Sequence, residues 1–186
     1  MVGRSPGRQR HDEDAFARLV DRDLDRVWRF LRALVHDPDL AHDLSQETFL
    51  RLNAALAADR IRGLGPDGLP PLAYVFAAAR NAACSHGRWR RRAEVVDLDA
   101  AAPIAAASAT PDERVADGEL RLALDRALAS LDPEHREVFL LSEVEELRYA
   151  DIADILGVPP GTVASRKHHA VQQLRRELKE LGHAVP

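Results

Sequence analysis

Basic and polar side chains that could bind DNA follow one side of a helix predicted to begin near Thr162. The opposite side is apolar at helical spacing and includes Val163, Ala170 and Leu174. A preceding helical pattern ends at Gly157, and residues 158–161 allow only a short turn. Two short helices joined in this way predict a helix-turn-helix, whose second helix can enter the DNA major groove. Its polar side consists of Ser165, Arg166, His168, His169, Gln172, Arg175 and Arg176.

A second polar stripe lies on a helix predicted over residues 38–58. Its members are Asp39, Asp43, Gln46 and Glu47, which share one helical face. Carboxylates and an amide on one face can form charge-assisted hydrogen bonds with a basic protein partner. An isolated stripe of this kind is more often a solvated helix face.

The residues suited to catalysis or metal binding form no constellation. The eight histidines are scattered, and the pair His168–His169 lacks nearby cysteines or acids at metal-ligand spacing. Cys84 is the single cysteine, which excludes an internal disulfide and fits a reducing compartment. We therefore expect no enzyme activity, no metal and no cofactor.

Composition places these stripes in an all-α protein. The 186 residues have only 5% aromatics, strand-forming residues are sparse, and alanine, leucine and arginine dominate. The net charge is −4, but residues 1–92 and 161–186 are basic, with 16 Lys+Arg against 12 Asp+Glu and five against two. Basic blocks are where a DNA contact is expected. The basic N-terminus has no apolar stretch behind it and no apolar run could span a bilayer, so we expect a cytoplasmic protein without direct membrane insertion.

The order of elements predicts two small helical domains joined by a flexible acidic linker. Residues 1–11 are expected to be a disordered basic arm, and residues 12–92 a first domain. In that domain Asp37-Pro38 caps the second helix, residues 59–71 form a Gly/Pro-rich loop, and a third helix runs over 72–92. Residues 93–110 read as the linker, and residues 111–186 as a second domain of four helices ending in the helix-turn-helix.

Three motifs in this order resemble a known family. They are DLSQETF in the second helix, ARN in the third helix and GVPPGTV in the turn of the helix-turn-helix. Together they resemble bacterial RNA polymerase sigma factors of the extracytoplasmic-function (ECF) group, over nearly everything from Asp14 to Leu178. The resemblance implies a protein that binds core RNA polymerase, directs it to a promoter and helps to open the duplex. It also implies that Asp39, Asp43, Gln46 and Glu47 face the polymerase, whose clamp helices and flap are the expected contacts.

The third helix and the loop before it match the family's reader of the −10 promoter element. The resemblance implies that Asn81 lines a pocket for a base extruded from the melting duplex, because an amide can donate to and accept from a base edge. Loop residues from Arg60 to Leu69 would complete the pocket, and arginines would hold phosphates. Trp89 could stack on a base, although packing is the commoner role of such an aromatic. The expected contacts besides Asn81 are Arg60, Arg62, Arg80, Arg88, Trp89, Arg90, Arg91 and Arg92.

The second helix of the helix-turn-helix matches the family's reader of the −35 element. Ala164, His169 and Ser142 stand where family members commonly have arginine or lysine. Arginine is the usual bidentate reader of guanine, so the upstream sequence read by this chain stays open. The implied DNA contacts are Thr162, Ser165, Arg166, Lys167, His168 and His169.

Other features of the sequence leave alternatives open. Glu94, Asp97 and Asp99 of the linker could mimic phosphates in a basic polymerase channel, or could belong to an ordinary solvated tether. ECF proteins are often held inactive by an anti-sigma partner, which the resemblance makes an expected partner here. Two further readings are a stand-alone helix-turn-helix regulator and a degenerate sigma-like protein that binds polymerase but not DNA.

Overall fold

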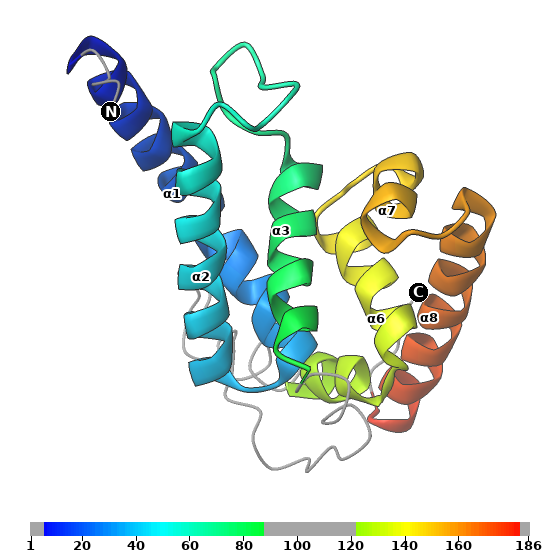
Figure 1. Ribbon diagram of the computed structural model, residues 1–186. Helices are drawn as coiled ribbons and strands as arrows, with labels where there is room; N and C mark the ends of the chain where they lie inside the picture. The colour runs from blue at the N-terminus through cyan, green and yellow to red at the C-terminus, as the bar shows by residue number, and fades with distance from the viewer. Residues whose placement is uncertain (1–5, 88–121, 183–186) are drawn as a thin grey trace, which may run out of the picture.

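The computed structural model describes residues 6–87 and 122–182, and every regular element in these two ranges is a helix (Figure 1). This confirms the all-α prediction. The first range, here called the N-terminal unit, contains α1 (Pro6–Val35), α2 (Pro38–Ala57) and α3 (Leu72–Ser85). The second range, the C-terminal unit, contains a helix over residues 122–130, α6 (Pro133–Phe139), the π-helical turn η2 (Leu140–Val144), α7 (Tyr149–Leu156) and α8 (Pro160–Glu180).

The three long helices of the N-terminal unit pack around one apolar core. Asp37 caps α2 as expected: its carboxylate accepts hydrogen bonds from the Asp39 and Leu40 amides at 3.1 and 3.0 Å, and Pro38 is the first helical residue. The rings of Phe30 and Phe76 meet edge to face, with centroids 5.1 Å apart, and join α1 to α3. The largest buried side chains here are Leu19, Val27, Phe30, Leu31, Val35, Leu44, Leu52, Val75 and Phe76.

Two boundaries of the N-terminal unit differ from the sequence prediction. Helix α1 begins at Pro6, so a disordered arm through residue 11 is wrong for residues 6–11. Proline suits a first helical turn, and the arginines and glutamine that follow are good helix formers. Helix α3 ends at Ser85, not Arg92, because His86 is the C-cap and Gly87 adopts φ 57°, a left-handed conformation that stops a helix. The expected linker over 93–110 and the start of the next helix at 111 lie outside the described residues.

The C-terminal unit contains the expected helix-turn-helix, formed by α7 and α8. Gly157 has φ 67° and the Val158 amide donates to the Ala153 carbonyl at 3.1 Å, so the glycine ends α7 as predicted. The sequence pattern did not predict η2, in which the Glu145 amide donates to the Leu140 carbonyl at 3.0 Å, five residues back. The helix over 122–130 packs on α8 through a small apolar cluster: Ala123, Ala127, Leu128, Leu131, Ala170, Leu174 and Leu178.

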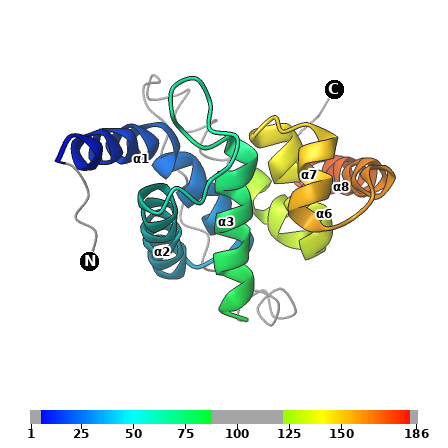
Figure 2. The same ribbon diagram turned by 45° about the horizontal axis from the view of Figure 1, so that its top comes forward.

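The two units share one hydrophobic core. Side chains of the C-terminal unit complete the apolar cluster of α1, α2 and α3, and Figures 1 and 2 both show α3 beside α6 and α7. Nothing in the sequence pattern predicted this packing, because the same stripes would serve either unit alone. The side chains of the C-terminal unit that enter this core are Val138, Leu140, Leu141, Ile152, Ala153 and Val163.

No helix in the described ranges is long and apolar enough to cross a membrane.

Arg136 joins the two units at their buried junction. Its guanidinium donates at 2.6 to 2.8 Å to the carbonyls of Leu128 and Ala129, in the last turn of the 122–130 helix, and of Leu131, just after it. Its Nη1 atom lies 2.5 Å from Nε2 of His36, in the turn between α1 and α2. Burial lowers the pKa of Arg136 to about 10, so the guanidinium stays charged at neutral pH. A buried charged guanidinium is stable only when its N–H groups have acceptors, so the three carbonyls and His36 are all required.

His36 is held neutral by this junction. Burial, then the positive charges of Arg136 and Arg32, lower the pKa of His36 to about 4. In the unfolded chain the imidazole takes up a proton near its ordinary value of 6.5, whereas the folded chain resists protonation down to about 4. The unfolded state thus binds more protons in this window, and stability falls as the pH decreases through it.

We expect the free energy of unfolding to fall by up to about 3 kcal/mol between pH 6.5 and pH 4 because of this histidine alone. His36→Asn provides the comparison, since asparagine tolerates the φ of 53° at this position and can accept from Arg136, but does not titrate. Urea unfolding across this pH range checks the difference between the two proteins. Parallel pH profiles would contradict the assignment. The raised pKa values of Glu137 and Glu145 act in the opposite direction but are common to both proteins.

Candidate functional site

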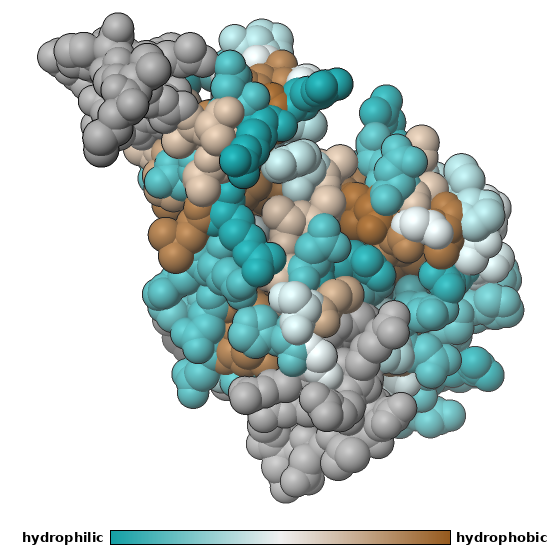
Figure 3. Space-filling view, viewed as in Figure 1, coloured by the Kyte–Doolittle hydropathy of each residue, from teal (hydrophilic) through white to brown (hydrophobic). Residues whose placement is uncertain are grey.

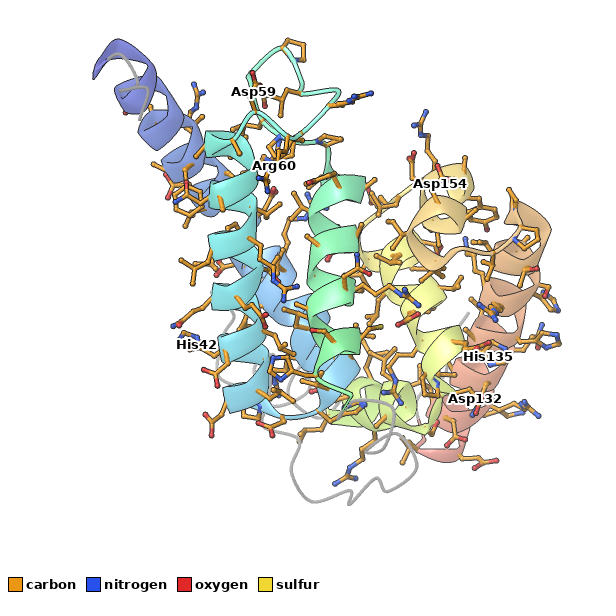
Figure 4. All side chains as sticks on the ribbon, in the orientation of Figure 1. His42, Asp59, Arg60, Asp132, His135 and Asp154 are labelled. Atoms are coloured by element: carbon orange, nitrogen blue, oxygen red, sulfur yellow. The ribbon has the colours of Figure 1, made fainter. Side chains whose placement is uncertain are left out.

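The polar stripe of α2 lies on its solvent side. Asp39, Asp43 and Gln46 are exposed and Glu47 is half-buried, while Leu44 and its neighbours on the opposite side enter the core. Figure 4 shows His42 on the same outward side, and its ring nitrogen lies 2.8 Å from the Gln46 amide. Helix α2 thus presents two exposed carboxylates and an exposed amide together, as its spacing predicted.

Glu47 already has two partners within the chain. One carboxylate oxygen accepts from Arg51 at 2.5 Å, and the other lies 3.1 Å from Nε2 of His86 after the end of α3. These contacts fix the direction of the Glu47 side chain and tie α2 to the end of α3. A surface ion pair of this kind stabilises little, so it can exchange for a partner's cation.

Leu50 is an apolar residue on the polar face that the sequence analysis missed. It is 67% exposed, the most of any large apolar side chain in the described ranges. It follows Gln46 by four residues and Asp43 by seven, and therefore shares their face. The signal was available, because Leu50 falls outside the buried stripe of Leu44, Thr48 and Leu52. An exposed leucine ringed by polar groups is typical of a protein-binding surface.

The α2–α3 loop has a buried apolar residue near each end and exposed residues between them. Ile61 and Leu69 are buried, whereas Arg60, Arg62 and Leu64 are exposed. Figure 4 shows Arg60 at the start of the loop, beside the last turn of α2. Figure 3 shows hydrophilic side chains over much of the face that includes the loop and α2, with a hydrophobic area over α7.

Arg80 and Asn81 are neighbours in α3 with different surroundings. Asn81 is exposed, as a base-contacting amide must be. Arg80 faces the C-terminal unit, and its Nε atom lies 3.3 Å from Oε2 of Glu137 in α6. The Glu137 side chain is 4% exposed, and burial raises its pKa although Arg80 opposes the shift. The other Glu137 oxygen has no hydrogen-bond partner among the described residues. Arg80 is therefore occupied by an internal carboxylate.

The remaining basic residues expected near Asn81 lie outside the described residues. They are Arg88, Trp89, Arg90, Arg91 and Arg92.

The recognition helix α8 exposes some of its predicted DNA contacts and pairs others. Ser165 and His168 are exposed, and His169 is exposed beside His135 with ring centroids 5.8 Å apart; Thr162 is half-buried. Figure 4 shows His135 and Asp132 on the same unit, near α8, but no group in the described ranges has the three ligands that a metal ion needs.

Two cations of α8 form ion pairs with acids on the preceding elements. Arg166 pairs with Glu134 of α6. Lys167 lies 2.5 Å from a Glu143 oxygen and 5.5 Å from the centre of the Tyr149 ring, and the Glu143 hydrogen bond raises the pKa of Lys167. The helical pattern put Arg166 on the polar side of the helix and the resemblance added Lys167 as a DNA contact, but neither predicted these carboxylate partners.

Family comparisons account for both units. Residues 19–93 match the model for Sigma-70 region 2, and residues 121–174 match the model for Sigma-70, region 4. These two matches define a sigma-70-type transcription factor. The chain is 36% identical over 171 residues to the RNA polymerase sigma factor CarQ of Myxococcus xanthus, covering 91% of this chain and 92% of that protein. It is 37% identical over 169 residues to the ECF RNA polymerase sigma factor SigL of Mycobacterium tuberculosis, covering 88% and 89%.

A solved structure has a similar arrangement. The sigma factor RpoE from Bartonella quintana, crystallised with the anti-sigma factor NepR, matches with a TM-score of 0.65 and 25% identity, covering 88% of this chain and 96% of that one. The chain therefore belongs to the ECF group of bacterial RNA polymerase sigma factors. It is a promoter-specific initiation factor for RNA polymerase.

Arg80→Ala should destabilise the fold by about 3 kcal/mol, because it leaves the buried Glu137 carboxylate without its cation. The double variant Arg80→Ala/Glu137→Gln should recover most of that loss, since a neutral amide is cheaper to bury. Urea unfolding of the two variants and the unchanged protein provides the measurement. Equal destabilisation by the single and double variants would show that the ion pair is not what the Arg80 side chain contributes.

Proposed function

We propose that three surfaces of this sigma factor divide its work: α2 binds core RNA polymerase, the α2–α3 loop with α3 reads the −10 element, and α8 reads the −35 element. The proposal includes cytoplasmic action without catalysis by the chain itself. The observation that carries it is the exposed amide of Asn81. One turn before it, Ala77 and Ala78 have small side chains that leave the amide accessible, whereas Ala79, Ala82 and Ala83 are buried in the core. The exposed Asn81 side chain does not pack in the hydrophobic core, which favours a contact with an external base.

The polymerase surface combines charge with one apolar anchor. Asp39, Asp43, Gln46 and Glu47 supply acceptors for basic residues of the clamp helices, and Leu50 adds an exposed apolar side chain on the same face. Interfaces commonly combine a central apolar residue with a polar rim, which supports assigning this face to a protein partner and not to DNA. Its negative charge supports the same assignment, because carboxylates repel phosphates.

The DNA-binding cations act by exchanging partners. Arg80, Arg166 and Lys167 each pair with a carboxylate of the chain itself. To hold a DNA phosphate, each must leave that carboxylate, and for Arg80 this requires α3 to separate from α6. We therefore expect the −35 DNA to be contacted first by Thr162, Ser165, His168 and His169. Arg166 and Lys167 contact it after they have left Glu134 and Glu143.

An anti-sigma protein is the proposed partner of the closed arrangement. The similar RpoE chain was crystallised in complex with the anti-sigma factor NepR. The shared core of the two units here keeps Arg80 turned away from solvent, as a partner that holds the sigma factor inactive would require. The acidic residues Glu94, Asp97 and Asp99 remain proposed contacts within polymerase or solvated linker residues.

Run-off transcription with purified core polymerase and a promoter library tests the whole proposal. Specific initiation supports it. Binding to an operator without polymerase would instead indicate a stand-alone regulator, and polymerase binding without initiation would indicate a degenerate sigma-like protein.

Asn81→Ala should reduce open-complex formation about tenfold or more while leaving the affinity for core polymerase unchanged, since one base-edge contact is lost. Permanganate footprinting reports the melted bases, and a fluorescence binding assay reports the polymerase affinity. Arg126→Ala is the matched control, because Arg126 is an exposed polar residue on the other unit. An equal loss of polymerase binding and melting would refute the pocket role of Asn81.

Glu47→Arg should weaken binding to core polymerase by at least about tenfold, because it places a cation opposite the basic clamp. Asp154→Arg makes the same charge change on an exposed residue of α7 and should leave the affinity unchanged. Circular dichroism verifies that both variants remain folded. If Glu47→Arg and Asp154→Arg bind polymerase equally, the α2 face is not the polymerase surface.

A further inference from the structure

Two arginines of α1 hold the α2–α3 loop in a defined shape. Arg22 donates from Nη2 to the Pro70 carbonyl at 2.8 Å, and its Nη1 lies 3.6 Å from the Asp67 carboxylate. Arg18 donates to the Asp67 backbone carbonyl at 3.1 Å. These contacts join residues almost fifty positions apart in the chain, and both ribbon views show the loop next to α1 (Figures 1 and 2).

Arg22 is itself held by a buried carboxylate. Its Nε and Nη2 atoms donate to the two oxygens of Asp23 at 2.9 and 2.8 Å, and the Asp23 side chain is wholly buried. A forked pair of this kind fixes the plane of the guanidinium. The Arg22 side chain is about one third exposed, so it can contact the loop while the buried Asp23 carboxylate fixes its orientation.

Hydrogen bonds within the loop also hold its shape, and Asp67 takes part in them. Its side chain accepts from the Leu69 amide at 3.0 Å, and the Gly65 amide donates to the Leu69 carbonyl at 2.8 Å. A Cβ at Gly65 would lie 2.6 Å from the Asp67 carboxylate, so the two residues are in close contact. Asp67 therefore links the tight turn in the loop to Arg22 and Arg18 on α1.

The geometry points to Arg22, braced by Asp23, as a positioning residue that sets which base the −10 pocket accepts. It acts through the shape of residues 62–67 and touches no DNA itself. This inference rests on the proposed role of the loop. A preformed loop discriminates between bases better than a mobile one. To bind the wrong base, a preformed loop must change shape and lose its contacts with α1, which costs binding free energy.

A structural role alone would give a different result from a positioning role. If Arg22 only stabilised the fold, its loss would lower transcription from every promoter equally. If it positions the loop, its loss changes the ranking of bases. Lysine cannot replace the guanidinium, because one ammonium group does not bind Asp23 in a fork while reaching Pro70.

The test uses the full chain with core polymerase on promoters that carry each of the four bases at every −10 position. Arg22→Ala should reduce the ratio of transcription between the preferred and second base by about tenfold at one position, with the −35 preference unchanged. Arg22→Lys should reduce it to a similar degree. Asp67→Ala should do the same from the loop side, and since Asp67 is exposed, this variant keeps the test valid if Arg22→Ala fails to fold.

Arg29→Ala is the matched control. Arg29 lies two turns beyond Arg22 on the same side of α1, and its Nε atom donates to the Asp25 carbonyl in its own helix at 3.2 Å. It should leave base preference unchanged. A uniform loss of activity in Arg22→Ala and an unchanged ranking in Asp67→Ala would overturn the inference.

A separate variant distinguishes failure of this inference from failure of the proposed function. Arg62→Ala alters the exposed part of the loop itself. If Arg62→Ala changes base preference and neither Arg22→Ala nor Asp67→Ala does, the loop reads DNA but α1 does not position it, and the inference is wrong. If none of the three changes the preference, the loop is not the −10 reader and the proposed function of that surface is wrong as well.

Discussion

The buried guanidinium of Arg136 is the interaction on which the arrangement of the two units depends. It satisfies three carbonyls at the end of the 122–130 helix and also reaches His36 between α1 and α2. A buried charge is tolerated only where its donors are paired, so the helix end and the turn must both be in place together. One side chain thereby ties the end of the 122–130 helix and α6 to the turn between α1 and α2.

Apolar burial and ion pairing have different roles at this junction. The side chains of α6, η2, α7 and α8 that enter the shared core supply the driving force for association. The pairs Arg26–Glu145 and Arg80–Glu137 have nearly buried carboxylates, and such pairs contribute little net stability. They do define one relative position of the units, because any other position leaves a carboxylate buried without its cation.

Local features were predictable from sequence because their causes are local. Asp37-Pro38 caps α2 and Gly157 ends α7 through the conformations of those residues alone, and helical spacing grouped Asp39, Asp43 and Gln46, which are exposed together on α2. Asn81 was singled out by the family resemblance, and it is exposed. The end of α3 was missed because Gly87 stops a helix whose basic residues favour continuation. The partners of Arg80 and Arg22 were missed for another reason: each lies on an element distant in sequence, and no periodicity within a segment reports tertiary contacts.

The internal carboxylates have a consequence for measurements of DNA binding. Free cations on a protein surface displace condensed counterions from DNA, and the salt dependence of affinity counts the phosphates that they neutralise. Arg80, Arg166 and Lys167 are paired with carboxylates of the chain, and in the proposed DNA complex they exchange these for phosphates. The freed carboxylates then attract cations from solution, which offsets part of the ion release from DNA. Under this proposal, the slope of affinity against salt concentration undercounts the phosphates that the sigma factor contacts.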